Sequence, residues 1–203
     1  MKRCSSQQAL ERLRSGKPLV VSTDTVYGLG VSVAHCPSPE DLFRIKKRDH
    51  AKPIAWLMAD PSDLAVYGEG VPGYAKCLAR DFWPGALTLI VQGSSAVPSA
   101  YAAEDGSIAL RVPDAPELRA LMRDLGSALA TSSANVSGHS PATSLGEVDP
   151  AIARFAPECF LSEVAPSGQA STIVDCRGEE PVILRQGDIF SACIAASIAE
   201  RFE

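Results

Sequence analysis

The chain has 203 residues, of which 46% are hydrophobic and 21% are charged. This composition is that of an ordinary globular protein and excludes a disordered or fibrous chain. A chain of this length should bury about 70% of its unfolded surface, so a substantial core is expected. The formal net charge of −5 argues against bulk attraction to nucleic acid or anionic membranes, and any RNA binding must therefore be local.

Targeting and metal signals are lacking in the sequence. The six cysteines include no C-x-x-C pair and do not group with the three histidines as a zinc site would require. We therefore expect reduced thiols and no protein-held metal. Residues 1–18 carry several charges without an apolar block, and no apolar run approaches the length of a membrane span. We expect a cytoplasmic protein.

Cap and turn residues divide the first half of the chain into helices and strands. Ser5 and Gln8 form a capping box, and Gly16 ends the helix that follows. Ser38 and Pro39 begin a second helix, which ends at a basic cluster. The predicted strands cover 19–21, 31–33, 53–58 and 86–91, and two further short helices begin at 60–61 and 72.

The second half continues this alternation. A strand over 107–112 precedes a helix over 115–125 that Gly126 ends, and 128–130 leads into a polar loop. Residues 171–175 and 181–184 read as a strand pair, and Asp188 is expected to cap a last helix over 189–202. The pattern predicts an α/β fold in one domain, 1–203, with a twisted, open, mixed sheet flanked by helices.

Polar clusters fall where predicted strands end, which is where chemistry is usually found. They cover 23–28, 46–52, 131–138, 171–172 and 185–187. Arg111 is a charge inside an otherwise apolar strand, and the pattern alone leaves a solvated face and a ligand carboxylate as equal explanations. Likewise, Gly28 and Gly30 have a structural explanation, because glycine permits a tight connection between strands.

The basic run Lys46-Lys47-Arg48, followed by Lys52, is compatible with a grip on phosphate groups. Such a run at the end of a helix more often compensates the helix dipole on a solvated face. The motif Ser133-Ala134-Asn135 could supply neutral hydrogen bonds to the same ligand. Together, the two motifs indicate a site for a polyanionic small molecule.

Seven ordered blocks along nearly the whole chain resemble the YrdC-like family of L-threonylcarbamoyladenylate synthases. The blocks are Ser-Thr-Asp-Thr-Val-Tyr-Gly-Leu at 22–29, Lys-x-Arg at 46–48 with Lys52-Pro53, Trp-Pro-Gly-Ala-Leu-Thr at 83–88, Ala-Leu-Arg-Val-Pro at 109–113, Ser-Ala-Asn-Val-Ser-Gly at 133–138, Ser-Thr-Ile-Val-Asp at 171–175 and Ile-Leu-Arg-Gln-Gly at 183–187. The resemblance implies an open sheet curved around a concave positive cavity.

The resemblance also implies an enzyme, a nucleotidyltransferase. It would join L-threonine, bicarbonate and ATP, with Mg²⁺ accompanying the ATP, into threonylcarbamoyl-AMP and pyrophosphate. The product would pass to proteins that transfer the threonylcarbamoyl group to tRNA. A local affinity for tRNA or double-stranded RNA would be consistent with the family, whereas a membrane partner would not.

By the same resemblance, the site residues fall into three sets. The catalytic set is Lys46, Arg48, Ser133 and Asn135. The ATP-binding set is Arg48, Lys52, Ser133, Asn135, Ser137 and Arg185. The threonine-binding set is Thr25, Ser107, Arg111 and Ser171, with Arg111 as the partner of the amino-acid carboxylate.

Two positions depart from the family pattern, since Ser22 and Gln186 stand where proline is common. The chain also resembles the short form of these synthases, without an added C-terminal domain. The alternatives are a catalytically silent paralogue, an RNA-binding module of the same fold, and a carbamoyl-transfer domain. The last occurs in much longer chains with zinc-finger-like cysteines, which this sequence lacks.

Overall fold

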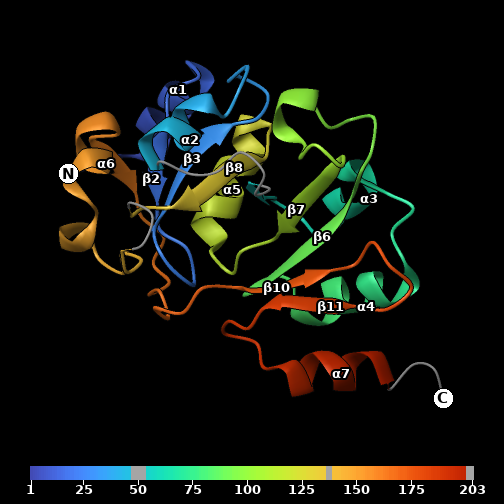
Figure 1. The fold of residues 1–203 in the computed structure, drawn as a ribbon. Helices are drawn as coiled ribbons and strands as arrows, with labels where there is room; N and C mark the ends of the chain where they lie inside the picture. The colour runs from blue at the N-terminus through green and yellow to red at the C-terminus, as the bar shows by residue number, and fades with distance from the viewer. Residues whose placement is uncertain (47–53, 136–138, 200–203) are drawn as a thin grey trace.

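The fold is built on one mixed β-sheet, which extends across the molecule in Figure 1. The computed structural model describes residues 1–46, 54–135 and 139–199. Within these residues the strand order is β1-β9-β2-β3-β8-β4-β7-β6-β10-β11, and β5 pairs with β6. The strands are β1 (Lys2–Arg3), β2 (Leu19–Val21), β3 (Gly28–Ser32), β4 (Ala55–Leu57), β5 (Gly68–Glu69), β6 (Leu87–Gly93), β7 (Ser107–Arg111), β8 (Leu129–Ser133), β9 (Glu158–Phe160), β10 (Thr172–Asp175) and β11 (Val182–Arg185).

The sheet contains both parallel and antiparallel pairs of strands. β9 is parallel to both β1 and β2, β4 is parallel to β7, and β6 is parallel to β10. The other neighbours are antiparallel. A mixed sheet was predicted, and it is confirmed.

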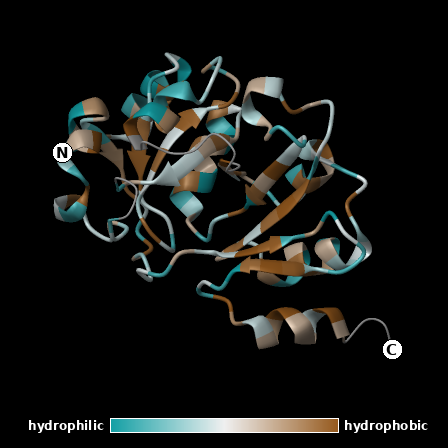
Figure 2. Ribbon diagram, in the orientation of Figure 1, coloured by the Kyte–Doolittle hydropathy of each residue, from teal (hydrophilic) through white to brown (hydrophobic). Residues whose placement is uncertain are grey.

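Helices cover both faces of the sheet (Figure 1). The helices are α1 (Ser6–Arg14), α2 (Glu40–Lys46), α3 (Asp63–Tyr67), α4 (Gly73–Phe82), α5 (Pro116–Leu125), α6 (Pro150–Phe155) and α7 (Ser191–Ala199), and the short 3₁₀ helices are η1 (Ser99–Tyr101) and η2 (Leu145–Glu147). Side chains alternate between the faces of a strand, so Trp56 and Leu57 enter different core clusters. In Figure 2 strands β6 and β7 are largely brown, because most of their residues are apolar.

The two core clusters divide the helices between them. Buried residues of α1 and α5 share one cluster with Leu57 and Leu129, whereas α2, α3, α4, α6 and α7 contribute to the other cluster around Trp56. Helices α1 and α5 therefore pack over the β9-β2-β8 part of their face. The rest of that face, over β4, β7, β6 and β10 and the adjoining ends of β3 and β8, is where the cavity described below lies.

Several predicted caps are present. Ser5 Oγ accepts from Gln8 N at 3.3 Å while Ser5 N donates to Gln8 Oε1 at 3.0 Å, so the capping box is confirmed. Gly126 ends α5 with φ 68°, in the left-handed region that favours glycine. Ser38 Oγ accepts from Glu40 N at 3.2 Å at the start of α2.

Other boundaries were predicted wrongly. The last helix begins at Ser191 rather than residue 189, because the carbonyl of Phe190, and not the side chain of Asp188, receives the first helical hydrogen bonds. Thr131, Ser132 and Ser133, predicted as loop, continue β8 between β3 and β4. The strands β1, β5 and β9 were not predicted, since two or three residues show no period, and helix α6, of six residues, was not predicted either.

Candidate functional site

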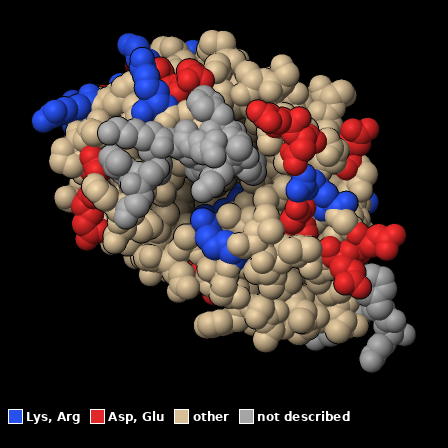
Figure 3. Space-filling view, in the orientation of Figure 1, with Lys and Arg blue, Asp and Glu red and all other residues tan. Residues whose placement is uncertain are grey.

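A cavity of about 560 Å³ lies on the same face of the sheet as α1 and α5, over the part of that face that the two helices do not cover. Its floor consists of small residues on the central strands, where Ala55 of β4 lies between Ala109 of β7 and Thr131 of β8. Short side chains here give the cavity its depth. In the space-filling view the hollow lies near the centre of the face, and basic side chains border it (Figure 3).

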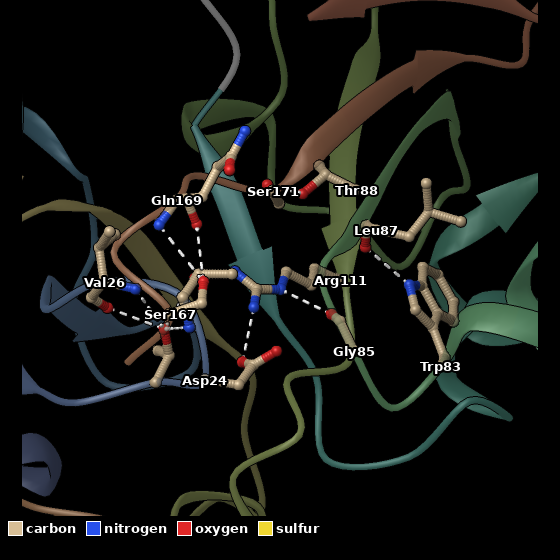
Figure 4. A network of polar contacts seen from close by, with 12 residues as sticks. Asp24, Val26, Trp83, Gly85, Leu87, Thr88, Arg111, Ser167, Gln169 and Ser171 are labelled. Atoms are coloured by element: carbon tan, nitrogen blue, oxygen red, sulfur yellow. Dashed lines mark hydrogen bonds and ion pairs between the residues drawn. The ribbon is translucent and has the colours of Figure 1, made fainter. Parts of the chain in front are cut away.

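Arg111, at the end of β7, is the more buried of the two arginines that line the cavity, the other being Arg185. Its Nε donates to Gly85 O at 2.9 Å, Nη1 donates to Thr25 Oγ1 at 2.8 Å, and Nη2 donates to Asp24 Oδ1 at 2.6 Å (Figure 4). Both members of the ion pair are largely buried, with 7% of the Arg111 side chain and 12% of the Asp24 side chain exposed. The solvated-face explanation for Arg111 is therefore wrong.

Two opposing effects act on the pKa of Arg111. Burial lowers the pKa of its guanidinium, and the adjacent Asp24 carboxylate opposes this shift. A guanidinium has five N–H groups, and three of them bond to Gly85, Thr25 and Asp24. Within the described residues, one N–H on each Nη has no partner. Arg111 can therefore still donate to a ligand in the cavity.

Thr25 is held in place by the turn that begins at Thr23. Thr23 Oγ1 accepts from Thr25 N at 3.2 Å and from Val26 N at 3.3 Å, which is a hydroxyl-capped turn. The hydroxyls of Thr23 and Thr25 also lie 3.0 Å apart. This turn places the Thr25 hydroxyl against Arg111.

A second group of polar side chains faces the cavity from the far strands. Arg185 of β11 donates through Nε and Nη2 to Ser171 O, at 3.1 and 2.8 Å, and through Nη2 to Ser171 Oγ at 3.2 Å. Thr88 of β6 lies 2.8 Å from the Ser171 hydroxyl. The antiparallel pairing of β10 with β11 brings Arg185 to Ser171.

The structure brings five of the predicted site residues to one cavity. Thr25, Arg111, Ser133, Ser171 and Arg185 all line it. They come from five segments that are well separated in the sequence. The ligand roles predicted for them remain predictions, but their proximity is now established.

The other predicted site residues either lie away from this group or fall outside the described residues. Ser107 is buried at the opposite end of β7 from Arg111, where its hydroxyl donates to Asp105 Oδ1 at 2.6 Å, and it does not line the cavity. Its position does not support the predicted contact with threonine. Lys46 is the last residue of α2, and its side chain is outside the described part. Arg48, Lys52 and Ser137 also lie outside the described residues.

Asn135 is only 8% exposed and does not line the cavity either. Its Nδ2 donates to the backbone carbonyl of His139. We therefore expect Asn135→Asp to destabilise the protein by about 1–3 kcal/mol, because a carboxylate cannot donate and would face that carbonyl oxygen. Thermal unfolding without ligands measures this. An unchanged unfolding midpoint would show that this hydrogen bond does not stabilise the fold. The predicted role of Asn135 in ligand binding would then be the one left to test.

Neither a membrane-spanning helix nor a metal-binding cluster is found among the described residues. Among the described residues, none of the helices is both long enough and apolar enough to cross a membrane. The same residues contain no cluster of three or more His, Cys, Asp or Glu side chains that could hold a metal ion. The Asp24 carboxylate beside Arg111 is already engaged by that arginine.

A family model matches most of the chain. It is the Sua5/YciO/YrdC model, described as "Telomere recombination", and it covers residues 11–187. The chain belongs to this family. The resemblance noted from the sequence is thereby confirmed, and every cavity residue described above lies within the matched range.

Curated relatives in this family carry consistent names. The threonylcarbamoyl-AMP synthase of Bacillus subtilis is 34% identical over 198 residues, which is 94% of this chain and 56% of that protein. A putative threonylcarbamoyl-AMP synthase of Mycobacterium tuberculosis is 31% identical over 92% of this chain and 86% of that protein. This member of the family therefore spans little more than half of the Bacillus subtilis protein and most of the Mycobacterium tuberculosis one.

The fold is also that of solved structures in the family. The structure of Sua5 from Pyrococcus abyssi complexed with L-threonine has a TM-score of 0.85 and 29% identity, covering 98% of this chain and 60% of that one. That protein binds L-threonine.

Two polar residues of the site were missed by the sequence reasoning, namely Thr88, which lines the cavity, and Asp24, which pairs with Arg111. Both lie inside blocks that carried the family resemblance, at 22–29 and 83–88. The block positions were a signal that these side chains could be functional. Their contacts could not be foreseen, because each has its partner more than 80 residues away in the sequence.

Proposed function

We propose that this chain is a threonylcarbamoyl-AMP synthase, which forms threonylcarbamoyl-AMP and pyrophosphate from L-threonine, bicarbonate and ATP. The observation that carries the proposal is the convergence of Arg111, Thr25 and Ser171 on one cavity, in a family whose curated relatives bear this name. An arginine with two N–H groups to spare, flanked by hydroxyls, suits the carboxylate and hydroxyl of threonine.

The reaction needs no protein nucleophile. The threonine amine would capture carbon dioxide with loss of a proton, or bicarbonate with loss of water, to give a carbamate. An oxygen of this carbamate would attack the α-phosphorus of ATP and expel pyrophosphate. Catalysis then consists of holding the two reactants in line and neutralising charge. Arg111 and its neighbours would hold the amino acid, while Arg185 and Ser133 would lie toward the nucleotide. The described residues of the cavity contain no Ser/His/Asp or Cys/His set.

The nucleotide would bind as the Mg²⁺ complex of ATP. We propose that Lys46, Arg48 and Lys52 grip its phosphates and that Ser137 binds it from the loop that follows Asn135. Asn135, whose Nδ2 bonds to His139 O, would support that loop. Because the described residues offer no carboxylate cluster, the phosphates and water would hold the Mg²⁺. The product would then pass to proteins that modify tRNA.

The test is direct. Purified protein is mixed with ATP, Mg²⁺, bicarbonate and radiolabelled L-threonine, and pyrophosphate and a labelled adenylate are measured. We expect both products, and neither when threonine is omitted. Folded protein that makes neither product would support the silent-paralogue reading. RNA affinity that weakens with salt, in a protein without turnover, would support an RNA-binding module instead.

A further inference from the structure

Two hydroxyl groups from neighbouring parts of the sheet meet in the cavity wall. Thr88 Oγ1 and Ser171 Oγ lie 2.8 Å apart, and the two residues are only 2% and 6% exposed (Figure 4). The parallel pairing of β6 with β10 fixes this meeting, because Leu87 pairs with Thr172, next to Ser171. The proposed reaction, as described so far, gives Thr88 no part.

The hydrogen bonds of this pair can be counted. Each hydroxyl has one proton and two acceptor positions, and one proton is shared between the two oxygens. Ser171 Oγ also accepts from Arg185 Nη2 at 3.2 Å. The described chain gives neither hydroxyl a further partner. One O–H of the pair is therefore left over, and both residues line the cavity.

The hydrogen bond from Arg185 determines which of the two hydroxyls can donate the remaining proton to a bound anion. If Thr88 donates to Ser171, then Thr88 and Arg185 occupy both acceptor positions of Ser171 Oγ, and the Ser171 proton can only point away from them. A donor next to a guanidinium makes a strong bond to an anionic oxygen. The reverse arrangement would leave Ser171 with an acceptor position facing the ligand, which an anionic oxygen cannot use.

We propose that Thr88 is a positioning residue that orients the Ser171 hydroxyl as a hydrogen-bond donor to an oxygen of the amino-acid substrate. The inference rests on the proposed function and deepens it. Thr88 acts through Ser171 and need not touch the substrate itself. Its hydroxyl, rather than its bulk, is what the site requires.

Substitutions at Thr88 separate these two properties. Thr88→Val keeps the shape and loses the hydroxyl, whereas Thr88→Ser keeps the hydroxyl. In steady-state assays of pyrophosphate release, Thr88→Val should raise the KM for L-threonine about tenfold, the equivalent of one hydrogen bond of about 1.4 kcal/mol. The KM for ATP should change by less than about twofold, and Thr88→Ser should remain close to wild type. Thr88→Ala gives a second test if the valine variant is poorly folded.

A double variant tests whether Thr88 acts through Ser171. Thr88→Val in a Ser171→Ala background should add almost nothing to the loss from Ser171→Ala alone, because the group to be oriented is already absent. Ser32→Ala is a matched control, since the Ser32 hydroxyl is also buried against another hydroxyl, that of Ser127 at 3.1 Å, but away from the cavity. It should leave the KM for threonine unchanged.

The outcomes are distinguishable. An unchanged KM for threonine in Thr88→Val, equal losses in the valine and serine variants, or fully additive losses in the double variant would each overturn the role of Thr88. In those cases the wild-type protein still turns over, so the proposed function stands. A wild-type protein that neither releases pyrophosphate nor binds L-threonine in calorimetry would overturn both.

Discussion

Replacing Arg111 by alanine is expected to destabilise the folded protein by about 3–5 kcal/mol, the loss typical when one partner of a buried ion pair is removed. The Asp24 carboxylate, 2.6 Å from the guanidinium and largely buried, would be left without a cation. Gly85 O and Thr25 Oγ1 would lose their donors as well. Urea unfolding of wild type and variant measures the difference.

An exposed ion pair provides the control. Arg123 Nη2 lies 2.7 Å from Asp60 Oδ1, but 47% of the Arg123 side chain is exposed. Solvent screens such a pair, and Arg123→Ala should therefore cost far less stability than Arg111→Ala. Equal losses in the two alanine variants would contradict the special position of Arg111. A loss near zero in both would mean that Asp24 finds solvent when its partner is removed.

Folding and binding at Arg111 can be separated by changing both charges. Arg111→Gln combined with Asp24→Asn removes the buried charges together while keeping polar groups that can bond to each other. We expect this double variant to recover most of the stability that Arg111→Ala loses, but not the affinity for L-threonine in calorimetry. Full recovery of threonine affinity would show that Arg111 holds the fold and not the ligand.

The second large effect is expected at Gly187, which follows β11. A Cβ at this position would lie 2.5 Å from Thr172 N and closer still to the backbone of Ala170 and Ser171. Backbone atoms cannot give way as a flexible side chain can. Gly187→Ala should therefore cost about 3 kcal/mol, the upper end of the usual penalty for overpacking, and should displace Ser171 from the cavity wall.

This prediction has two readouts and a control. Thermal or urea unfolding reports the loss of stability, and the KM for L-threonine should rise with the displacement of Ser171. Gly73→Ala is the matched change, because Gly73 begins α4 and a Cβ there would meet nothing within 4 Å. Alanine in a helix should be neutral or slightly stabilising. A Gly187→Ala protein as stable as Gly73→Ala would contradict the close approach.

Local signals explain which parts of the fold were predictable. The capping box at Ser5 and the left-handed glycine at Gly126 are encoded within a few residues, and both are present. The extension of β8 to Ser133 was not predicted, because Thr131, Ser132 and Ser133 are polar and read as loop. They continue the strand because all three pair with β3 and Thr131 also pairs with β4, and polar side chains are tolerated where the strand borders a cavity.

The candidate site was likewise predictable only in part. The motif blocks identified Thr25, Arg111, Ser171 and Arg185 as a group, and they line one cavity. What the blocks could not show is what each side chain touches. The pairing of Arg111 with Asp24 depends on the sheet bringing residues 87 positions apart into contact. The separation of Ser107 from the cavity likewise follows from its place at the opposite end of β7 from Arg111.

The order in which the sheet is assembled has a consequence for synthesis on the ribosome. Ala55 in the floor of the cavity and Arg111 belong to strands made earlier, whereas Ser171 precedes β10 and Arg185 ends β11, the last two strands among the described residues. Likewise, β2 must wait for β9 before it gains its second neighbour. A nascent chain that ends before β10 would thus lack the side of the cavity that carries Ser171 and Arg185. Substrate binding would stabilise the finished fold and leave incomplete chains unaffected.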